Sequence, residues 1–203
     1  MIILDKYKLP ESNYNKKFSN KKRIVISNSF SVNMSHYVGW LNRYNGKYKK
    51  TAHYTITLDG KIYQHIDPIY QSEFIGDKNF DESTIYVVIE NEGWLREKID
   101  SENTYINYVG YIYNRDESVF VKSWRNNNLW APYSKEQIES TIFLIKNLVN
   151  EFNINKSVPD SNVKIVNQLL EYGVLYRGNI DTKYTDVNPN WGFTFFKDNI
   201  FKK

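Results

Sequence analysis

Residues 53–64 read HYTITLDGKIYQ, and this stretch carries the clearest structural pattern of the sequence. Apolar and polar side chains alternate over residues 53–58 and again over residues 61–66, as they do in strands that bury one face. Asp59-Gly60 lies between the two runs and is typical of a two-residue hairpin turn. The stretch therefore predicts a β-hairpin.

Three other apolar runs predict strands outside the hairpin. Residues 24–26 read IVI, a short β-branched run bounded by polar residues, and residues 84–90 read TIYVVIE. Both runs are typical of buried strands, because strands covered on both faces have near-continuous apolar sequences. Residues 174–176 read VLY and predict a last strand.

Helical periodicity occurs between these strands. Apolar and aromatic residues recur every three or four positions over 31–44 and over roughly 134–153, and Ser134 with Gln137 predicts a capping box at the start of the second helix. A shorter helix or mixed segment is expected over 162–171. Strands that alternate with helices predict the α/β class, with a mixed central β-sheet flanked by helices.

The length of 203 residues indicates one domain. Residues 1–22 are polar and aperiodic, so we expect an extended N-terminal arm ahead of a domain over 23–203. Residues 94–132 are rich in Asn, Tyr and Trp and alternate only weakly. We expect an irregular insertion there, with a hairpin around 114–116.

The composition excludes several classes of protein. The sequence has no Cys, which excludes disulfides, thiol catalysis and Cys-containing zinc sites. No apolar run reaches the roughly 18 residues of a membrane span, and the start does not resemble a signal peptide, so we expect no membrane partner. The net charge of +4 is spread along the chain and does not predict nucleic-acid binding, because phosphate contacts need clustered Lys and Arg. Frequent Asn, Lys, Ile and Tyr indicate a genome rich in A and T, as in viruses or low-GC bacteria.

Glu90 and Glu92 are the candidates for acid–base chemistry. They lie two positions apart at the end of a predicted strand, so both side chains project from the same face. Two carboxylates on one face raise each other's pKa, which produces a general acid or base near neutral pH. The alternative is a pair that is solvated or salt-bridged to Lys or Arg.

His36, His53 and His65 are the three histidines of the sequence. Their spacing does not match that of a zinc motif, and His36 falls on the aromatic face of a predicted helix. We therefore expect all three to be structural residues with satisfied hydrogen bonds.

Five pieces of the sequence, in order, match the motifs of a known family. They extend over about residues 23–197 and are residues 24–29, the Asp59-Gly60-Lys61-Ile62-Tyr63-Gln64 part of the hairpin, residues 89–93, the capped helix from Ser134, and Tyr184-Thr185-Asp186 before Asn188-Pro189. In this order they resemble the zinc-dependent N-acetylmuramoyl-L-alanine amidases. That family includes phage and bacterial cell-wall amidases and the animal peptidoglycan recognition proteins.

The resemblance implies a fold, a ligand and a mechanism. The fold would be a mixed sheet flanked by helices, with a groove that holds a zinc ion and a muramyl peptide of peptidoglycan. In the family the metal polarises the lactyl amide carbonyl and activates a water, while a Glu or Tyr on a neighbouring strand handles the proton. The catalytic Glu would be Glu90, and Asp186 would stand at the position of the third metal ligand.

The sequence departs from the family at the other metal positions. Ser27, followed by Asn28, stands where the family has its first His, and residues 176–179 read YRGN where a second His is expected. Zinc requires imidazole, thiolate or carboxylate donors, so we expect the zinc site to be lost or degraded, with no cofactor unless the site is rearranged. The groove His expected after the hairpin is replaced around Glu73-Phe74, and a Tyr replaces the basic residue two positions before the third ligand. The residues left for ligand binding are Ser27, Asn28, Glu92, Arg177, Asn179 and Tyr184, with Asp186 as a weak metal ligand.

Three hypotheses follow for the function. The first is an amidase-like protein, a pseudoenzyme, that binds peptidoglycan or a related muramyl-peptide ligand, in a phage virion or in the host cytoplasm. The second is an active N-acetylmuramoyl-L-alanine amidase that uses a rearranged site or Glu90 as the base. The third is a structural or partner-binding virion protein in which the insertion over 94–132 fills the groove. The sequence predicts no oligomeric state.

Overall fold

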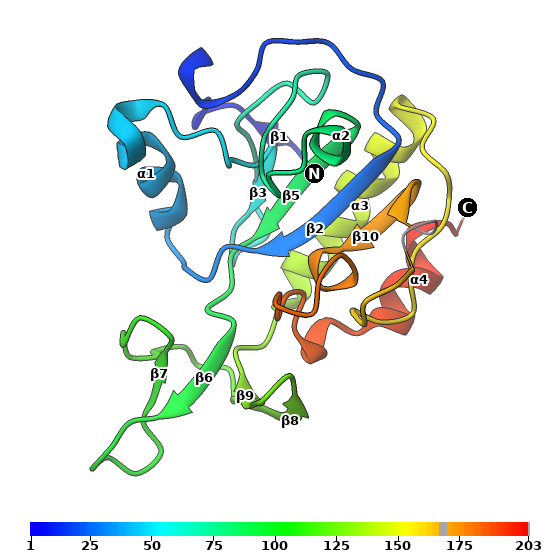
Figure 1. The fold of residues 1–203 in the computed structure, drawn as a ribbon. Helices are drawn as coiled ribbons and strands as arrows, with labels where there is room; N and C mark the ends of the chain where they lie inside the picture. The colour runs from blue at the N-terminus through cyan, green and yellow to red at the C-terminus, as the bar shows by residue number, and fades with distance from the viewer. Residues whose placement is uncertain (167–169, 203) are drawn as a thin grey trace.

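Six strands form the central sheet of the computed structural model, which describes residues 1–166 and 170–202. β3 and β4 are antiparallel and the other neighbouring strands are parallel, so the sheet is mixed, as predicted. Figure 1 shows how they are arranged. The order is β1-β4-β3-β5-β2-β10, with bounds β1 Ile3–Leu4, β2 Arg23–Asn28, β3 Tyr54–Ile56, β4 Ile62–Gln64, β5 Thr84–Ile89 and β10 Gly173–Tyr176.

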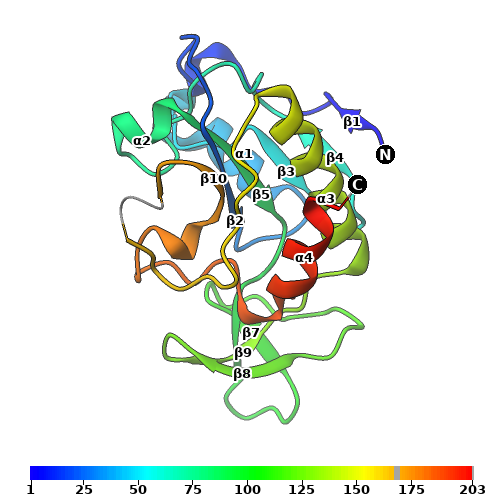
Figure 2. The ribbon, with the colours of Figure 1, turned by 90° about the vertical axis from the view of Figure 1, so that its right-hand side faces the viewer.

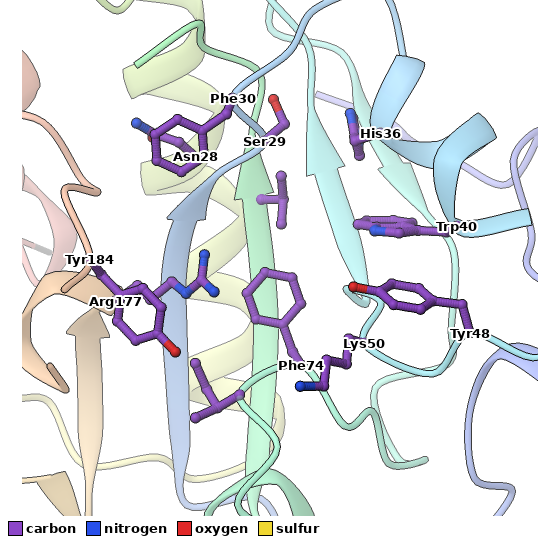
Figure 3. A pocket seen from close by; sticks show the side chains of 12 residues that line it. Asn28, Ser29, Phe30, His36, Trp40, Tyr48, Lys50, Phe74, Arg177 and Tyr184 are labelled. Atoms are coloured by element: carbon purple, nitrogen blue, oxygen red, sulfur yellow. The ribbon is translucent and has the colours of Figure 1, made fainter. Parts of the chain in front are cut away.

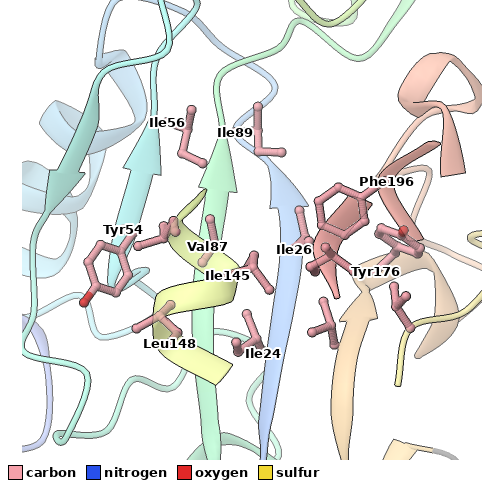
Figure 4. Packing of buried hydrophobic residues seen from close by; sticks show 14 of the residues in the cluster. Ile24, Ile26, Tyr54, Ile56, Val87, Ile89, Ile145, Leu148, Tyr176 and Phe196 are labelled. Atoms are coloured by element: carbon pink, nitrogen blue, oxygen red, sulfur yellow. The ribbon is translucent and has the colours of Figure 1, made fainter. Parts of the chain in front are cut away.

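The first face of the sheet is covered by two helices. α3 spans Lys135–Glu151 and α4 spans Phe193–Ile200. Ile24 and Ile26 of β2 belong to the buried cluster on this face, and Figure 4 shows Ile145 of α3 packed over the strands. Removal of this apolar surface from water is the main stabilising contribution to the fold.

The second face carries two shorter helices. α1 spans Ser35–Asn42 and α2 spans Lys78–Glu82, and Figure 2 shows both on the side of the sheet away from α3 and α4. Val25 of β2 and Trp40 of α1 belong to the buried cluster on this face. Since side chains alternate along a strand, β2 contributes to both cores, as its near-continuous apolar run predicts.

β3 and β4 form the predicted hairpin, but its turn differs from the prediction. Ile56 pairs with Ile62, and the N–H of Thr57 donates to the carbonyl of Lys61 at 3.0 Å, which leaves residues 58–60 as the loop. Gly60 ends the loop with a φ of +76°. The prediction of a two-residue turn was therefore wrong. A three-residue loop needs its last residue in the left-handed region, which Gly enters without steric cost.

The two longer predicted helices differ in how well they were placed. α3 starts at the predicted capping box, in which Ser134 Oγ accepts from the N–H of Gln137 and the Gln137 side chain accepts from the N–H of Ser134. α1 starts later than predicted, because Asn33 and Met34 have positive φ angles that a helix excludes. None of the helices in the described part of the chain has the length and apolar character needed to cross a bilayer.

The chain between α3 and β10 also differs from the sequence prediction. Residues 162–166 form bends and irregular backbone where a short helix or mixed segment was expected, and residues 167–169 of that segment lie outside the described residues. β10 follows as predicted, and its register pairs Tyr176 with Ile26 of β2.

The stretch over 94–132, expected to be irregular, forms a second antiparallel sheet of four strands among the described residues. Arg125 and Asn126 both have positive φ angles and make its tight turn, whereas the hairpin expected around 114–116 was wrong, since these residues lie between two strands that do not pair. Many of its side chains are exposed, which explains the weak alternation. Figure 1 shows this sheet beyond the carboxyl end of β5; its strands are β6 Trp94–Glu97, β7 Tyr105–Asn107, β8 Phe120–Trp124 and β9 Asn127–Trp130.

Residues 1–22 pack against the main sheet and α1. β1 pairs in parallel with β4, and Leu9 is buried in the cluster on the second face. The fully buried side chain of Asn13 donates to the carbonyls of Trp40 at 3.2 Å and Tyr48 at 2.8 Å. This segment therefore fixes the position of the chain at the end of α1.

Candidate functional site

The carboxyl ends of β2 and β10 bring several of the predicted binding residues together. The two strands are parallel neighbours, and their register pairs Ile26 with Tyr176, the residues directly before Ser27 and Arg177. Asn28 ends β2, and Asp186 reaches the same edge from the segment after β10. The carboxyl ends of strands are the usual location of ligand sites in open α/β sheets.

Asp186 is the buried centre of this cluster. Its Oδ2 atom accepts hydrogen bonds from Ser27 Oγ at 2.5 Å and from the Asn28 N–H at 3.2 Å, and Nη1 of Arg177 lies 3.8 Å away. The Asp186 side chain is fully buried, so these neighbours stabilise its charge in place of water. Its other oxygen, Oδ1, has no hydrogen-bond partner among the described residues.

Arg177 is held by two aromatic rings as well as by Asp186. The guanidinium carbon lies 3.9 Å from the ring centre of Tyr184 and 5.1 Å from that of Phe74, which are cation–π distances. The side chain is 20% exposed, and its buried Nε atom has no hydrogen-bond partner among the described residues. Arg177 thus reaches the surface of the site with one donor unused.

Asn28 is almost completely buried, yet one half of its amide is unpaired. Its Oδ1 atom accepts a hydrogen bond from the hydroxyl of Tyr133 at 2.5 Å, whereas Nδ2 has no partner among the described residues. A buried amide donor without a partner loses its hydration and gains no replacement. Within the described chain, Nδ2 of Asn28 is therefore an unsatisfied donor enclosed by the fold.

Asn179, also predicted to bind ligand, makes its hydrogen bonds within the fold. Its Oδ1 atom accepts from the N–H of Tyr176 at 2.8 Å, and its Nδ2 atom donates to the carbonyls of Ser161 at 2.8 Å and Val163 at 2.7 Å. The side chain is fully buried and lines none of the described cavities. Its contacts hold the chain after β10 in place.

A cavity of about 200 Å³ opens beside Arg177 and Asn28. Figure 3 shows Arg177 and Lys50 entering it from opposite sides, with the ring of Phe74 between them. Aromatic rings form much of its wall, and those rings are Phe30, Trp40, Tyr48, Phe74 and Tyr184. The cavity therefore combines positive charge with flat apolar surfaces.

A second cavity of about 590 Å³ adjoins the first. Both are lined by Ser29, Phe30, His36 and Trp40, so these residues form the boundary between them. The far wall of the larger cavity comes from the end of β7 and the loop after it, through Asn107, Tyr108, Val109, Tyr111 and Ile112. The stretch over 94–132 thus extends the groove and, among the described residues, contributes nothing to the wall of the smaller cavity.

Glu90 lies under the loop that precedes α1. Its Oε1 atom accepts a hydrogen bond from the N–H of Met34, and the side chain is buried. Burial raises the pKa of Glu90, an effect partly offset by hydrogen bonds from the backbone of Met34, Leu58 and Asn33. Glu90 lines none of the described cavities.

Glu92 has a different environment from Glu90. Its Oε2 atom accepts from Nη1 of Arg115 at 3.0 Å, and both side chains are largely buried at the edge of the larger cavity. Burial, with a smaller contribution from the charge of Asp59, raises the pKa of Glu90, and Glu92 is not among the causes. The two carboxylates therefore do not form the mutually coupled pair that the sequence suggested, and Glu92 is salt-bridged, as the alternative stated.

His36 and His65 share the hydroxyl of Thr55. The distances from Thr55 Oγ1 are 2.9 Å to Nε2 of His36 and 2.8 Å to Nε2 of His65. Burial lowers the pKa of His36 to about 3 and that of His65 to about 4, so both rings are neutral at physiological pH. The expectation of structural histidines with satisfied hydrogen bonds is confirmed for this pair, although His36 also lines both cavities.

The sequence did not single out Lys50 or Tyr48 as site residues. They lie in the connection between α1 and β3 and reach the cavity across the second face of the sheet. Residues 46–50 read GKYKK, which is typical of an exposed charged loop. A single sequence holds no signal that places such a loop at the end of β10.

The donors at this edge do not suit a zinc ion. Among the described residues, no three His, Cys, Asp or Glu side chains lie close enough together to hold a metal. Among the described residues of this cluster, Asp186 supplies the one carboxylate. That carboxylate already accepts hydrogen bonds from Ser27 and Asn28 and faces the guanidinium of Arg177. Hydroxyl and amide groups are poor zinc ligands, and a neighbouring cation opposes a second one.

The sequence profile described as N-acetylmuramoyl-L-alanine amidase matches residues 17–169, which is more than half of the chain. The match includes the hairpin, β5, the second sheet and α3. No curated protein matches the sequence.

Solved structures with TM-scores above 0.5 share the fold despite little sequence identity. The amidase LysC from Clostridium intestinale is 12% identical with a TM-score of 0.56, and the alignment covers 100% of this chain and 99% of LysC. A mutant endolysin from Bacillus subtilis is 17% identical with a TM-score of 0.53, covering 98% and 99%. AmiD from E. coli, solved with a muramyl-peptide substrate, is 16% identical with a TM-score of 0.46; the alignment covers 70% of this chain and spans 48% of AmiD.

Proposed function

Because the chain belongs to the N-acetylmuramoyl-L-alanine amidase family, we propose that it binds the muramyl-peptide part of peptidoglycan without zinc-dependent hydrolysis. The ligand would lie in the groove formed by the two adjoining cavities, at the carboxyl ends of the strands. From the composition we keep a phage or low-GC bacterial source as a prediction.

The contact between Arg177 and Asp186 carries this proposal. Asp186 stands where the resemblance puts the third metal ligand, and its Oδ2 atom lies 3.8 Å from a guanidinium nitrogen. The other two positions hold Ser27, with Asn28 after it, and the chain around Arg177, none of which supplies an imidazole. A fixed positive charge in this place supports a binding protein that has exchanged its metal for protein cations.

The size and surface of the groove support a ligand of the peptide–sugar kind. Cavities for small molecules are commonly a few hundred cubic ångströms, and the two cavities measure about 200 and about 590 Å³. Rings such as Trp40 and Tyr184 offer flat faces for sugar or peptide groups, and Asn28 and Ser29 add polar contacts.

One observation favours the alternative of a working hydrolase. Burial raises the pKa of Glu90, which is a property of general acids and bases. Against this, the carboxylate accepts hydrogen bonds from backbone N–H groups and lines none of the described cavities. We therefore keep catalysis by Glu90 as the second candidate function.

A second observation favours a partner-binding role for the stretch over 94–132. Tyr108, Val109, Tyr111 and Ile112 are all exposed on one loop beside the larger cavity. Exposed apolar side chains gathered in this way are typical of a contact surface. Such a role is compatible with ligand binding, because this loop contributes only to the outer part of the groove.

Two assays on the full chain separate these functions. Co-sedimentation with purified sacculi measures binding, and release of soluble stem peptides measures hydrolysis, each with zinc and with a chelator. We expect co-sedimentation that does not depend on zinc, together with no release of peptides. Peptide release by the wild type that disappears in Glu90→Gln would make catalysis, in place of binding alone, the function. Failure to sediment with sacculi would reject the peptidoglycan ligand.

A further inference from the structure

We propose that the smaller cavity is an anion site that holds a carboxylate of the ligand between Lys50 and Arg177. The inference builds on the proposed function, because that function supplies the peptide ligand whose carboxylate would enter. It goes further by assigning the site a charge preference and two residues that produce it.

The charge of the cavity is the first argument. Lys50 and Arg177 both line it, and no Asp or Glu does so among the described residues. His36 adds no charge, since burial lowers its pKa to about 3. The carboxylate of Asp186 offsets part of the positive charge of Arg177. Within the described chain, Lys50 forms no ion pair, so its charge is not offset. The wall therefore has a net positive charge.

The second argument is the geometry of the two cationic groups. The side chain of Arg177 is 20% exposed, and Arg177 and Lys50 line the cavity from opposite sides. A carboxylate is an acceptor with two oxygens, so it suits a planar guanidinium on one side and an ammonium group on the other.

The third argument is that Arg177 is already positioned. Its guanidinium is held by the ring of Tyr184 at 3.9 Å and by Asp186 at 3.8 Å. Ordering Arg177 therefore costs little when a ligand binds, which favours affinity. Lys50 is exposed and adds its charge from the opposite side of the cavity.

A carboxylate fits this cavity better than the alternatives. A cation would be repelled by Lys50 and Arg177, and a neutral sugar would leave the two charges unmatched. The aromatic walls at Phe74 and Tyr48 suit the short aliphatic part of an acidic amino acid. The acidic side chain of a peptide and its terminal carboxyl group present the same chemistry, and the probes below distinguish them.

Calorimetric titration of the full chain tests the charge preference. The acidic probe is N-acetylmuramoyl-L-alanyl-D-glutamate, and the neutral probe is the same compound with both carboxyls as carboxamides. We expect the wild type to bind the acid roughly tenfold or more tightly than the diamide, since hydrogen bonds to charged groups are the stronger kind. The two monoamides then identify which carboxylate enters the site.

Variants assign the effect to the named residues. Lys50→Gln and Arg177→Gln should each remove most of the preference for the acid. Arg177→Lys should retain part of the preference, because Lys keeps the positive charge but lacks the planar set of N–H donors of the guanidinium. Lys122→Gln is the matched control, because Lys122 is exposed on β8 and lines none of the described cavities. Should Arg177→Gln not fold, the exposed position of Lys50 keeps Lys50→Gln informative.

A second pair of probes separates this inference from the proposed function. Succinate and succinamide are compared by the chemical-shift changes of Asn28 and its neighbours, with no muramyl group present. Selective binding of succinate without binding of sacculi would keep the anion site and reject the peptidoglycan ligand. Equal affinity for acid and diamide with binding of sacculi would reject the anion site and keep the function. If neither pair of probes shows a preference for the acid, the inference is overturned.

Discussion

Arg177 and Asp186 approach within 3.8 Å at the carboxyl end of β10, with the carboxylate fully buried and the guanidinium near the surface. The pair joins the last strand of the sheet to the segment that leads to α4. It also sets the charge at this edge, because the guanidinium faces a cavity while the carboxylate points into the fold. Structure and ligand preference are therefore coupled through one contact.

Removal of Asp186 should destabilise the fold. Asp186→Ala leaves the partly buried Arg177 without its counter-charge and Ser27 Oγ without its acceptor. We expect a loss of about 3 kcal/mol in the free energy of unfolding, measured with urea. Asp181→Ala is the control, since the exposed pair of Asp181 with Lys183 should contribute little. Equal stability of the two variants would contradict the role of Asp186.

Acid should destabilise the protein through His53. The Nδ1 atom of His53 accepts from the N–H of Tyr86 at 3.0 Å, so its proton sits on Nε2, 3.1 Å from the carbonyl of Tyr70. Burial lowers the pKa of His53 to about 3. As pH falls below about 6.5, the unfolded chain binds a proton that the folded chain does not. This contribution is complete above that pH and is lost progressively as pH falls toward about 3.

Urea titrations at about pH 7.5 and about pH 5 measure this loss, which we expect to be on the order of 2 kcal/mol for one such group. His53→Gln should show a smaller difference between the two pH values than the wild type. An NMR titration of the folded protein in which the His53 ring changes its charge near its ordinary pKa would contradict the prediction.

A pair of glycine variants tests the position of Phe30. Gly93 has a φ of +78°, and a Cβ atom there would lie 2.5 Å from Cδ1 of Phe30, which lines both cavities. Gly110 has a φ of +93° with nothing within 4 Å of its Cβ position. Both Ala variants share the backbone strain, so Gly93→Ala should be less stable than Gly110→Ala by about 2 kcal/mol, from overpacking. Thermal unfolding and ligand titration check this, and we expect only Gly93→Ala to weaken binding.

The start of α3 offers a test of the local fold. Ser134 Oγ accepts from the Gln137 N–H at 3.1 Å and donates to the carbonyl of Leu58 at 2.7 Å, which ties the helix to the hairpin loop. Ser134→Ala should lower the free energy of unfolding by about 1 kcal/mol in thermal or urea denaturation. Lys135→Ala, at the next and highly exposed position, should leave stability nearly unchanged. A larger effect at Lys135 would contradict the capping role.

The sequence predicted those parts of the fold that depend on local patterns. The hairpin, β2, β5 and the capped α3 each follow from periodicity or from a cap motif, and all four were found. The three-residue loop at Gly60 was missed because Asp59-Gly60 suits both loop lengths. The second sheet was missed because many of its side chains are exposed or only half-buried, so no apolar face marked its strands.

The candidate site was predicted in part, for a physical reason. Ser27 lies near the end of β2 and Arg177 directly follows β10, and the ends of neighbouring parallel strands lie at one edge. The role of Asn179 inside the fold could not be foreseen, because its partners Ser161 and Val163 lie in irregular chain. Lys50 reaches the cavity from a loop whose path depends on tertiary packing, and the catalytic role of Glu90 stays a prediction.

The hydroxyl of Thr55 gives the hydrogen bonds around it a single direction. The Tyr7 carbonyl, 2.7 Å from Nδ1 of His65, can only accept, so the ring proton of His65 is on Nδ1. Nε2 of that ring then accepts a hydrogen bond from the hydroxyl of Thr55. Thr55 Oγ1 must then accept from Nε2 of His36, whose Nδ1 atom is left to accept from Ser31 Oγ at 3.4 Å. The backbone oxygen of Tyr7 thereby dictates the tautomer of His36, which lies between the two cavities. A chain that lacked residues 1–7 would free both imidazoles to exchange their roles.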